Sequence, residues 1–516
     1  MKQLEKIFFI SSIFLGIFIT NVYALDVDYI RGIDRYETAS LIASKMNYSS
    51  AILVNGNSLV DGLSSSGLSG ATNSPILLTR ASEIPQTTLN KLNGVNKVYI
   101  VGGTMVVSSN IEEQLKNSGK TVIRLSGDNR FETSKVVANE IERIKGVSEV
   151  YYVNGIGGEA DAMSIAPVAA KSANPVIITD GYSTDYIKSV PSYSIGGTTV
   201  LSTWFDGLST RIGGLNRFET NKKVIKNFYS EYDHVNLSKA YELIDALTAS
   251  ALKQPVVLAS DDSDKTVING AKSLTVFGNI SEVAISRAKA HVYGDKVVFY
   301  VQHQDDETLF GGSAIVDALH SVGKENVYVV LITQGDASGV FSWQRYALLS
   351  HDEKVGLRNN EFKAAVEALG VSSNNVIMLN QKEHSIDSSV VMNEMLKFEN
   401  KFDNVTHVTH SYKFETHPQH IATGGLLKKL HNDGLIKDCR FMASYKKISQ
   451  IGRNQLIESI ADNDEERQAV INACNEYKLD KKDMIREGIG YKSVTSMFDE
   501  IMMNKELPSY LHEGNL

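Results

Sequence analysis

The chain has 516 residues, 42% of them hydrophobic and 22% charged, with only 8 Pro and a formal net charge of −8 at pH 7. This length exceeds what one hydrophobic core normally organises, so we expect three or four domains, and the composition excludes long disordered segments. The negative charge and the lack of a basic stripe argue against nucleic acid as a partner.

The first residues carry the pattern of a secretory signal peptide. Lys2 and Lys6 precede an apolar run of 13 residues (7–19), and a small residue follows at Ala24. A membrane-spanning helix needs roughly 20 apolar residues, so the run is too short for an uncleaved anchor. We predict a signal peptide over 1–24, and therefore an exported protein that keeps no transmembrane anchor after cleavage.

Three copies of one unit follow the predicted signal peptide. An Arg-aromatic-Glu-Thr core occurs at Arg35, Arg130 and Arg217, and each core leads into a segment with helical periodicity. Each copy later contains a proline and a short β-branched run, in the forms PILLT, PVIIT and PVVLA. The alternation of strands and helices predicts small parallel α/β modules. We place the three copies at 27–120, 121–207 and 208–290.

Two local roles follow from the repeated core. A threonine hydroxyl can accept a hydrogen bond from the amides of a first helical turn, which predicts three helix caps: Thr38, Thr133 and Thr220. Each core arginine also has a glutamate two residues later, and pairing of the two within each core is the simplest structural role for the arginine.

The repeated pattern resembles the type 2 cell-wall-binding repeat of Gram-positive surface proteins, over roughly residues 27–290. The resemblance implies a pseudo-threefold assembly of three modules that attaches the secreted protein non-covalently to an anionic cell-wall polymer. Residues 25–290 hold 26 Lys/Arg against 27 Asp/Glu. Bulk attraction therefore cannot drive the binding, and Arg35, Arg130 and Arg217 are the candidate phosphate contacts.

The C-terminal region, 295–516, begins with a different pattern. Residues 297–301 form an apolar run typical of a strand buried on both faces, and the polar cluster 303–307 follows directly. A later β-rich run, VTHVTHSYKFETHPQH, ends in His417 and His420. Three adjacent carboxylates in the first cluster repel one another unless a cation or hydrogen-bond donors compensate them.

The two polar clusters can meet only if their strands are neighbours in one parallel sheet, because ligands sit at the carboxyl edge of such sheets. A histidine and an aspartate from the first cluster and a histidine from the second would then make a three-ligand metal site. Such a site leaves one coordination position open for water, which is typical of catalytic rather than structural zinc.

The order and spacing of these motifs resemble the PIG-L/LmbE-like de-N-acetylase family over about residues 295–425. The motifs are QHQDDE from Gln302, Arg358 with Glu361, and HPQH from His417. The resemblance implies a Rossmann-like α/β domain that holds Zn²⁺ or another divalent metal. It implies the following roles: His303, Asp306 and His420 as metal ligands, Asp305 as general base, His417 as acid or oxyanion partner, and Arg358 as a group that binds substrate or orients a carboxylate.

Together, the two resemblances predict a wall-anchored, metal-dependent amidohydrolase. It would remove acetyl groups from N-acetylated, GlcNAc-type sugars of peptidoglycan or a surface polysaccharide. Zinc lowers the pKa of its bound water to about 7, which suits amide hydrolysis.

Three departures keep alternatives open. Gln302 and Gln304 stand where the family has prolines, and Gln419 stands where it usually has an acid. The domain could thus be a catalytically weak or inactive surface-binding protein, and a metal-dependent phosphoesterase is a third alternative. The sequence leaves open whether Cys439 and Cys474 pair, and whether the tail, 453–516, covers the site.

Overall fold

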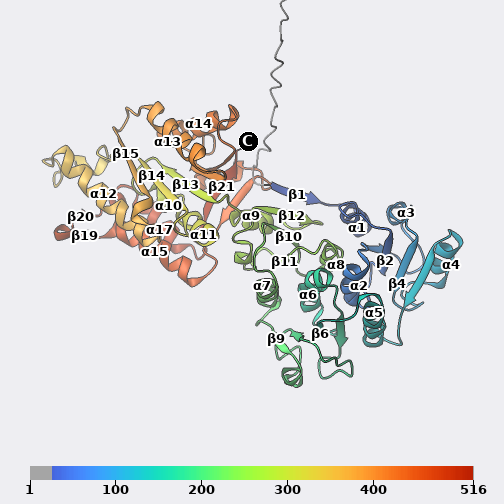
Figure 1. Ribbon diagram of the computed structural model, residues 1–516. Coiled ribbons are helices and arrows are strands. Elements are labelled where there is room, and N and C mark those ends of the chain that lie inside the picture. The colour runs from blue at the N-terminus through green and yellow to red at the C-terminus, as the bar shows by residue number, and fades with distance from the viewer. Residues whose placement is uncertain (1–25, 515–516) are drawn as a thin grey trace, which may run out of the picture.

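The computed structural model describes residues 26–514, so the predicted signal peptide, 1–24, lies outside the described residues. Figure 1 shows two parts: the repeats, blue to green, and a C-terminal domain, yellow to red, built on a larger sheet. Between residues 26 and 514, no helix combines the length and the hydropathy that a membrane span requires.

The repeat region contains three four-stranded sheets, and every strand pair in them is parallel. The first sheet has the order β3-β2-β4-β5, with β2 (Ser50–Asn55), β3 (Ile76–Thr79), β4 (Lys97–Val101) and β5 (Thr121–Leu125). The second has the order β7-β6-β8-β9, with β6 (Val150–Asn154), β7 (Val176–Thr179), β8 (Ser192–Ile195) and β9 (Thr210–Ile212). The third has the order β1-β12-β10-β11, with β1 (Asp26–Ile30), β10 (His234–Lys239), β11 (Val256–Ala259) and β12 (Ser273–Phe277). These sheets confirm the predicted parallel modules.

The edge strand of each sheet comes from another repeat, in which it is the segment just before the arginine core. Strand β5 precedes the second arginine core but pairs with β4, and β9 precedes the third core but pairs with β8. Strand β1, which precedes the first core, pairs with β12 at the far end of the repeat region. This exchange closes the three modules into a ring, as expected for a pseudo-threefold assembly.

Three helices meet where the modules touch. They are α2 (Ser65–Thr72), α6 (Glu159–Ser172) and α8 (Ile244–Ser250). Helix α2 packs against α6, and α6 against α8. The Ser66 and Ser250 hydroxyls share a buried hydrogen bond of 3.0 Å between α2 and α8. A Cβ added at Gly70 would lie 2.0 Å from the Ala170 carbonyl oxygen, so this close approach of α2 to α6 requires glycine.

The predicted threonine caps are wrong. The helices that begin at the core arginines are α1 (Arg35–Ala43), α5 (Arg130–Lys145) and α7 (Arg217–Phe228). Their caps are the preceding residues Asp34, Asn129 and Asn216, whose side chains accept from first-turn amides. The threonines lie inside the first turn, so Thr38, Thr133 and Thr220 accept instead from the loop amides of Gly32, Gly127 and Gly214.

The C-terminal domain is built on one seven-stranded sheet of order β15-β14-β13-β16-β17-β21-β18. The strands are β13 (Lys296–Val301), β14 (Val327–Thr333), β15 (Val376–Gln381), β16 (Val405–His410), β17 (Asp438–Met442), β18 (Leu456–Ser459) and β21 (Ser509–Glu513). Strands β13 to β17 pair in parallel, whereas β21 pairs antiparallel with both β17 and β18. The Rossmann-like expectation is confirmed for the parallel part.

Both faces of this sheet are buried, which explains the continuous apolar run of β13. Val297, Phe299 and Val301 join one hydrophobic core, and Val298 and Tyr300 join another on the opposite face. The first core includes helices α11 (Gly312–Val322), α12 (His351–Ala368) and α15 (Asp464–Lys478); the second includes α13 (Ser388–Lys401) and α14 (Pro418–Asn432).

Ion pairs between buried cations and partly exposed carboxylates join the ring to the C-terminal domain. Helix α9 (Glu282–Ala290) packs against β18. Its Arg287 lies 2.9 Å from Glu506, and its buried Lys289 donates over 2.6 Å to Glu513. Cys439 and Cys474 are both buried and free.

Candidate functional site

The site residues come together because β13 and β16 are neighbouring parallel strands. Each strand therefore delivers the residues after its carboxyl end to the same sheet edge. His303 to Asp306 follow β13, and His417 follows β16 as the residue before α14. His420 lies in the first turn of α14, and Pro418 occupies the first helical position, where a missing N–H costs nothing.

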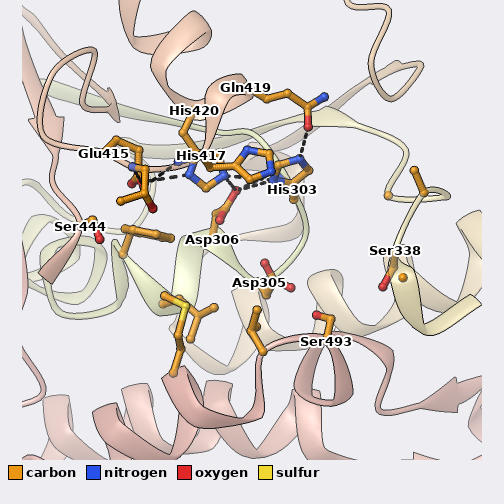
Figure 2. Close-up of a pocket in the computed structure, with 18 of the residues that line it drawn as sticks. His303, Asp305, Asp306, Ser338, Glu415, His417, Gln419, His420, Ser444 and Ser493 are labelled. Carbon is orange, nitrogen blue, oxygen red and sulfur yellow. Dashed lines mark hydrogen bonds and ion pairs between the residues drawn. The ribbon is translucent and has the colours of Figure 1, made fainter. Parts of the chain in front are cut away.

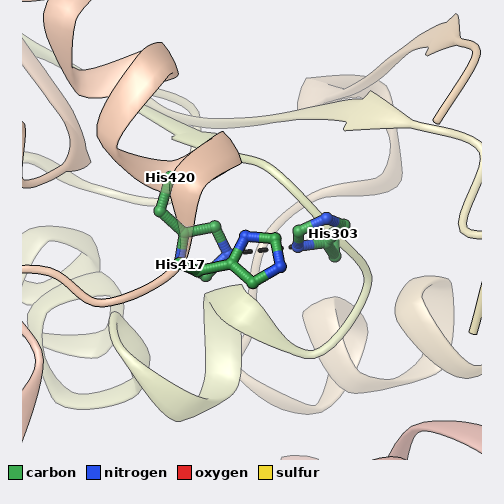
Figure 3. A group of neighbouring side chains, drawn as sticks. All are labelled: His303, His417 and His420. Atoms are coloured by element: carbon green, nitrogen blue, oxygen red, sulfur yellow. Dashed lines mark hydrogen bonds between the residues drawn. The ribbon is translucent and has the colours of Figure 1, made fainter. Parts of the chain in front are cut away.

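The three predicted metal ligands form a compact group. His303 Nδ1 lies 3.1 Å from His420 Nε2 and 3.3 Å from Asp306 Oδ2, and the latter two atoms are 3.2 Å apart. Figure 2 shows the imidazoles gathered around the Asp306 carboxylate, and Figure 3 shows how His303 approaches the first turn of α14. These three atoms are therefore close enough to bind the same ion.

These distances fit a single divalent metal. Zinc binds nitrogen and oxygen at about 2.0–2.1 Å, so neighbouring ligands of a tetrahedral ion lie about 3.3–3.4 Å apart. The three observed separations are within about 0.3 Å of that edge length. Two imidazoles with one carboxylate also suit zinc chemically. Burial of Asp306 opposes its charge, but the neighbouring His420 and His303 hold its pKa well below the ordinary value, so it offers an ionised oxygen.

His410, at the end of β16, is a neighbour of the metal group that the sequence analysis did not single out. Its ring stacks on that of His420 with centroids 3.8 Å apart, and its Nε2 lies 3.3 Å from Asp306 Oδ2. The same Nε2 accepts from the Gln302 amide, so its lone pair is already used. Burial lowers the pKa of His410 to about 4, and it therefore packs as a neutral ring.

Asp305 faces the same pocket from a strained backbone position. Its φ is +100°, which is rare for a residue with a side chain and is maintained only where the surroundings enforce it. Its Oδ2 accepts from Arg358 Nη2 over 2.8 Å. Burial raises the pKa of Asp305 to about 6, although Arg358 opposes the shift. A carboxylate in this range can exchange a proton near neutral pH.

Arg358 and the tail brace Asp305 from behind. Arg358 is 3% exposed and also donates to Glu361 over 2.9 Å. Glu361 in turn accepts from the amides of Ile489 and Gly490 in the tail. The Tyr477 hydroxyl accepts from the Asp305 amide and donates to Glu307, each over 2.8 Å. Arg358 therefore orients carboxylates, and the tail supports the site.

The pocket in front of Asp305 has a volume of about 340 Å³. His417 is exposed, and its ring centroid lies 4.6 Å from that of His420 and 5.0 Å from that of His303. Partial desolvation by the pocket wall and the two neighbouring imidazoles lower the pKa of His417. Ser493 and Met497 of the tail line the pocket, so the tail forms part of its wall.

The three glutamines that replace the usual residues of the family motifs each have polar partners. Gln302 accepts from the Thr423 hydroxyl, and the Gln304 amide donates to Asn359 over 2.9 Å. These contacts hold the loop without the fixed φ of proline. Gln419 lies beside His303, and Glu383, which follows β15, lies next to Gln419.

The three core arginines hold the loops of their own modules. Arg35 donates to the Gly56 carbonyl over 2.6 Å, Arg130 to Gly155 over 2.5 Å, and Arg217 to Ala240 over 2.6 Å. The expected pairing with the nearby glutamates is therefore wrong. In the first and third cores the glutamate accepts from a loop amide instead, that of Ile33 or Leu215. All three arginines are half-buried.

Each arginine core also faces a buried aspartate of another module. A hydrogen bond from Thr133 and the charge of Arg130 favour the ionised form of Asp61. Thr220 and Arg217 do the same for Asp161, and the charge of Arg35 does so for Asp245. In each case the arginine core belongs to the same repeat that supplies the edge strand to the sheet of the aspartate's module. Burial raises the pKa of Asp161 and of Asp245 to about 6, despite the neighbouring cations.

Two family patterns match the chain. The family described as "Cell wall binding domain 2 (CWB2)" matches residues 30–112, 124–204 and 211–319, which together are more than half of the chain. The family described as "GlcNAc-PI de-N-acetylase" (PIG-L) matches residues 298–431.

Several individual proteins are similar to parts of the chain. N-acetylmuramoyl-L-alanine amidase LytC of Bacillus subtilis is 29% identical over 59% of this chain and 67% of its own length. Cwp8 from Clostridium difficile is 30% identical over 51% of each chain, with a TM-score of 0.48. N,N'-diacetylchitobiose deacetylase from Pyrococcus horikoshii is 16% identical over 43% of this chain and 84% of that chain, with a TM-score of 0.30. The chain thus spans between half and about two thirds of the first two proteins.

Proposed function

The chain belongs to the cell wall binding domain 2 family and carries a PIG-L domain, and from this premise we propose that it is a wall-anchored, metal-dependent de-N-acetylase. Its substrate would be an N-acetylated, GlcNAc-type sugar of peptidoglycan or a surface polysaccharide. The observation that carries the proposal is the group of His303 Nδ1, Asp306 Oδ2 and His420 Nε2 within 3.1–3.3 Å of one another, beside the Asp305 carboxylate.

The residues of the site divide the work of amide hydrolysis. His303, Asp306 and His420 would hold the metal, which when bound would acidify a water molecule and polarise the acetyl carbonyl. Asp305 would accept the proton of the attacking water. A proton must reach the nitrogen as the C–N bond breaks, and His417, an exposed residue that lines the pocket, would deliver it. The products would be acetate and a free amino sugar.

Arg358 would keep Asp305 in the orientation that this proton transfer needs. Its two contacts, with Asp305 and Glu361, are both buried, and they occupy its guanidinium group. A general base held in place contributes roughly 10²–10⁴-fold to the rate. We therefore assign Arg358 to positioning the base rather than to binding substrate.

The ring of repeats would hold the enzyme at its substrate. The C-terminal region, 291–516, has 24 Lys/Arg against 32 Asp/Glu, so it would not be attracted to a polyanion by itself. We infer that the repeats attach the secreted protein to an anionic wall polymer. Because Arg35, Arg130 and Arg217 each keep a backbone partner and are only half-buried, their remaining N–H groups could contact phosphate.

The test is release of acetate from N-acetylglucosamine oligomers and wall fragments by the full chain. We expect release with zinc, loss of activity on chelation, and recovery when zinc is restored. Asp305→Asn should abolish release without preventing zinc binding, whereas Asp403→Asn in an exposed loop should not change it. A zinc-loaded wild-type protein that releases no acetate from either substrate would contradict the enzymatic proposal and leave a surface-binding protein.

A further inference from the structure

The outward nitrogen of His303 requires an explanation. His303 Nδ1 faces Asp306 and His420, whereas its Nε2 faces Gln419 and Glu383, which lies in the loop after β15. A histidine that binds a metal through one nitrogen usually donates its other N–H to a carboxylate or carbonyl, which fixes the tautomer and the ring orientation. Gln419 occupies the position where an acid was expected, so the motif itself supplies no such carboxylate.

The structure supplies a carboxylate from a different segment. Glu383 follows β15 and is 8% exposed. Its Oε2 accepts from Gln419 Nε2 over 3.2 Å and lies 3.6 Å from His303 Nε2. Gln419 Oε1 accepts from His303 Nε2 over 3.0 Å. The amide therefore stands between the imidazole and the carboxylate, and contacts both.

A third contact fixes the carboxylate itself. The Thr333 hydroxyl, at the end of β14, donates to Glu383 Oε1 over 3.0 Å. Both oxygens of this buried carboxylate thus have donors, as a buried ionised group requires. Because Thr333 is the last residue of β14, the position of Glu383 is tied to the strand that pairs with β13, and His303 follows β13.

We propose that Glu383 is the carboxylate partner of His303 and that Gln419 relays its effect. The amide donates to the carboxylate and accepts from His303 Nε2–H, so Nε2 keeps its proton and the Nδ1 lone pair is directed toward Asp306 and His420. Glu383 is a positioning residue that acts through Gln419 and contacts no reacting atom. This inference rests on the proposed metal site but not on the identity of the substrate.

The consequence is that the carboxylate has moved from the HPQH motif to the loop after β15. A carboxylate lost from this position typically costs 10–100-fold in metal affinity or activity. If Glu383 supplies it, Gln419 is no sign of a decayed site. The loss of metal affinity expected from a missing carboxylate should then appear on the change Glu383→Gln, although it does not result from the glutamine at position 419.

The test measures zinc affinity of the full chain by competition with a chelator at one pH. We expect Glu383→Gln to weaken zinc binding about 10–100-fold. Gln419→Leu should weaken it to a similar extent, because it breaks the same relay. Glu367→Gln, on the exposed part of α12, is the matched control and should bind as the wild type does.

The swapped double variant separates positioning from a general loss of structure. Glu383→Gln with Gln419→Glu returns a carboxylate to His303 from the other side, and we expect zinc affinity to recover to within a few-fold of wild type. A purely structural role of Glu383 would not be rescued in this way. Unchanged affinity in Glu383→Gln, or no recovery in a folded double variant, would overturn the inference. A zinc-binding wild type without deacetylase activity would contradict the proposed function alone.

Discussion

Removal of Arg358 should destabilise the C-terminal domain strongly, because it leaves buried carboxylates without their cation. Arg358 is 3% exposed and contacts Asp305 at 2.8 Å and Glu361 at 2.9 Å. Breaking a buried ion pair by removing one partner typically costs about 3–5 kcal/mol. Glu361 would keep the amides of Ile489 and Gly490, so we expect the lower end, about 3 kcal/mol, for Arg358→Met.

The chain offers a built-in reporter for this measurement. Its two tryptophans are Trp204, in the repeats, and Trp343, beside α12 in the C-terminal domain. In a Trp204→Phe background, fluorescence during urea unfolding therefore follows the C-terminal domain within the full chain. A loss of about 3 kcal/mol should lower the thermal midpoint of a domain of this size by roughly 6–12 °C.

A matched arginine provides the control. Arg345 pairs with Asp480 and Glu487, but its side chain is 45% exposed, and exposed pairs contribute about 0–1 kcal/mol. Arg345→Met should therefore change stability by less than about 1 kcal/mol. If Arg358→Met costs no more than Arg345→Met, the reasoning that Arg358 compensates buried charge is refuted.

Three further predictions follow from the same geometry. Tyr477→Phe removes the hydroxyl shared by the Asp305 amide and Glu307 and should cost about 1–3 kcal/mol in the same fluorescence assay; an unchanged midpoint would contradict the bracing role of the tail. Asp305→Asn should lower acetate release at least about 10²-fold with zinc affinity kept, and joint loss of both would contradict its role as base. Because burial raises the pKa of Asp161 to about 6, the folded state binds more protons than the unfolded state, and stability falls as pH rises from about 4 through 6. Asp161→Asn should remove up to about 3 kcal/mol of this fall in a Trp343→Phe background, and an unchanged pH profile would refute the assignment.

The sequence predicted those features that depend on residues close together along the chain. The apolar run after Lys296 is a strand because both faces of its sheet are covered, and alternate residues enter two separate cores. The histidine and aspartate motifs could be paired because parallel strands deliver their carboxyl ends to one edge. The meeting of His303 with His420 across 117 positions follows from that single rule.

The features that sequence reasoning missed depend on contacts between distant segments. The exchange of β1 into the third sheet joins the two ends of the repeat region, and no local pattern marks it. Glu383 belongs to none of the quoted motifs, and its role depends on Thr333 and Gln419. His410 ends the same strand that led to His417, and the parallel pairing with β13 would have pointed to it.

The helix caps show a different kind of error. Both the threonine and the residue before the arginine have side chains that can cap a helix, and only the start of the helix decides between them. The helix begins at the arginine, so Asn129 and Asn216 precede the first turn while the threonines lie within it.

The central claim is that His303, Asp306 and His420 hold one metal ion. The most direct measurement is the zinc content of the full chain after equilibrium dialysis, for the wild type and for Asp306→Ala and His420→Ala. We predict one zinc per wild-type chain and loss of that zinc in both variants, with the fold retained. A folded wild type that retains no zinc, or variants that retain it undiminished, would contradict the claim.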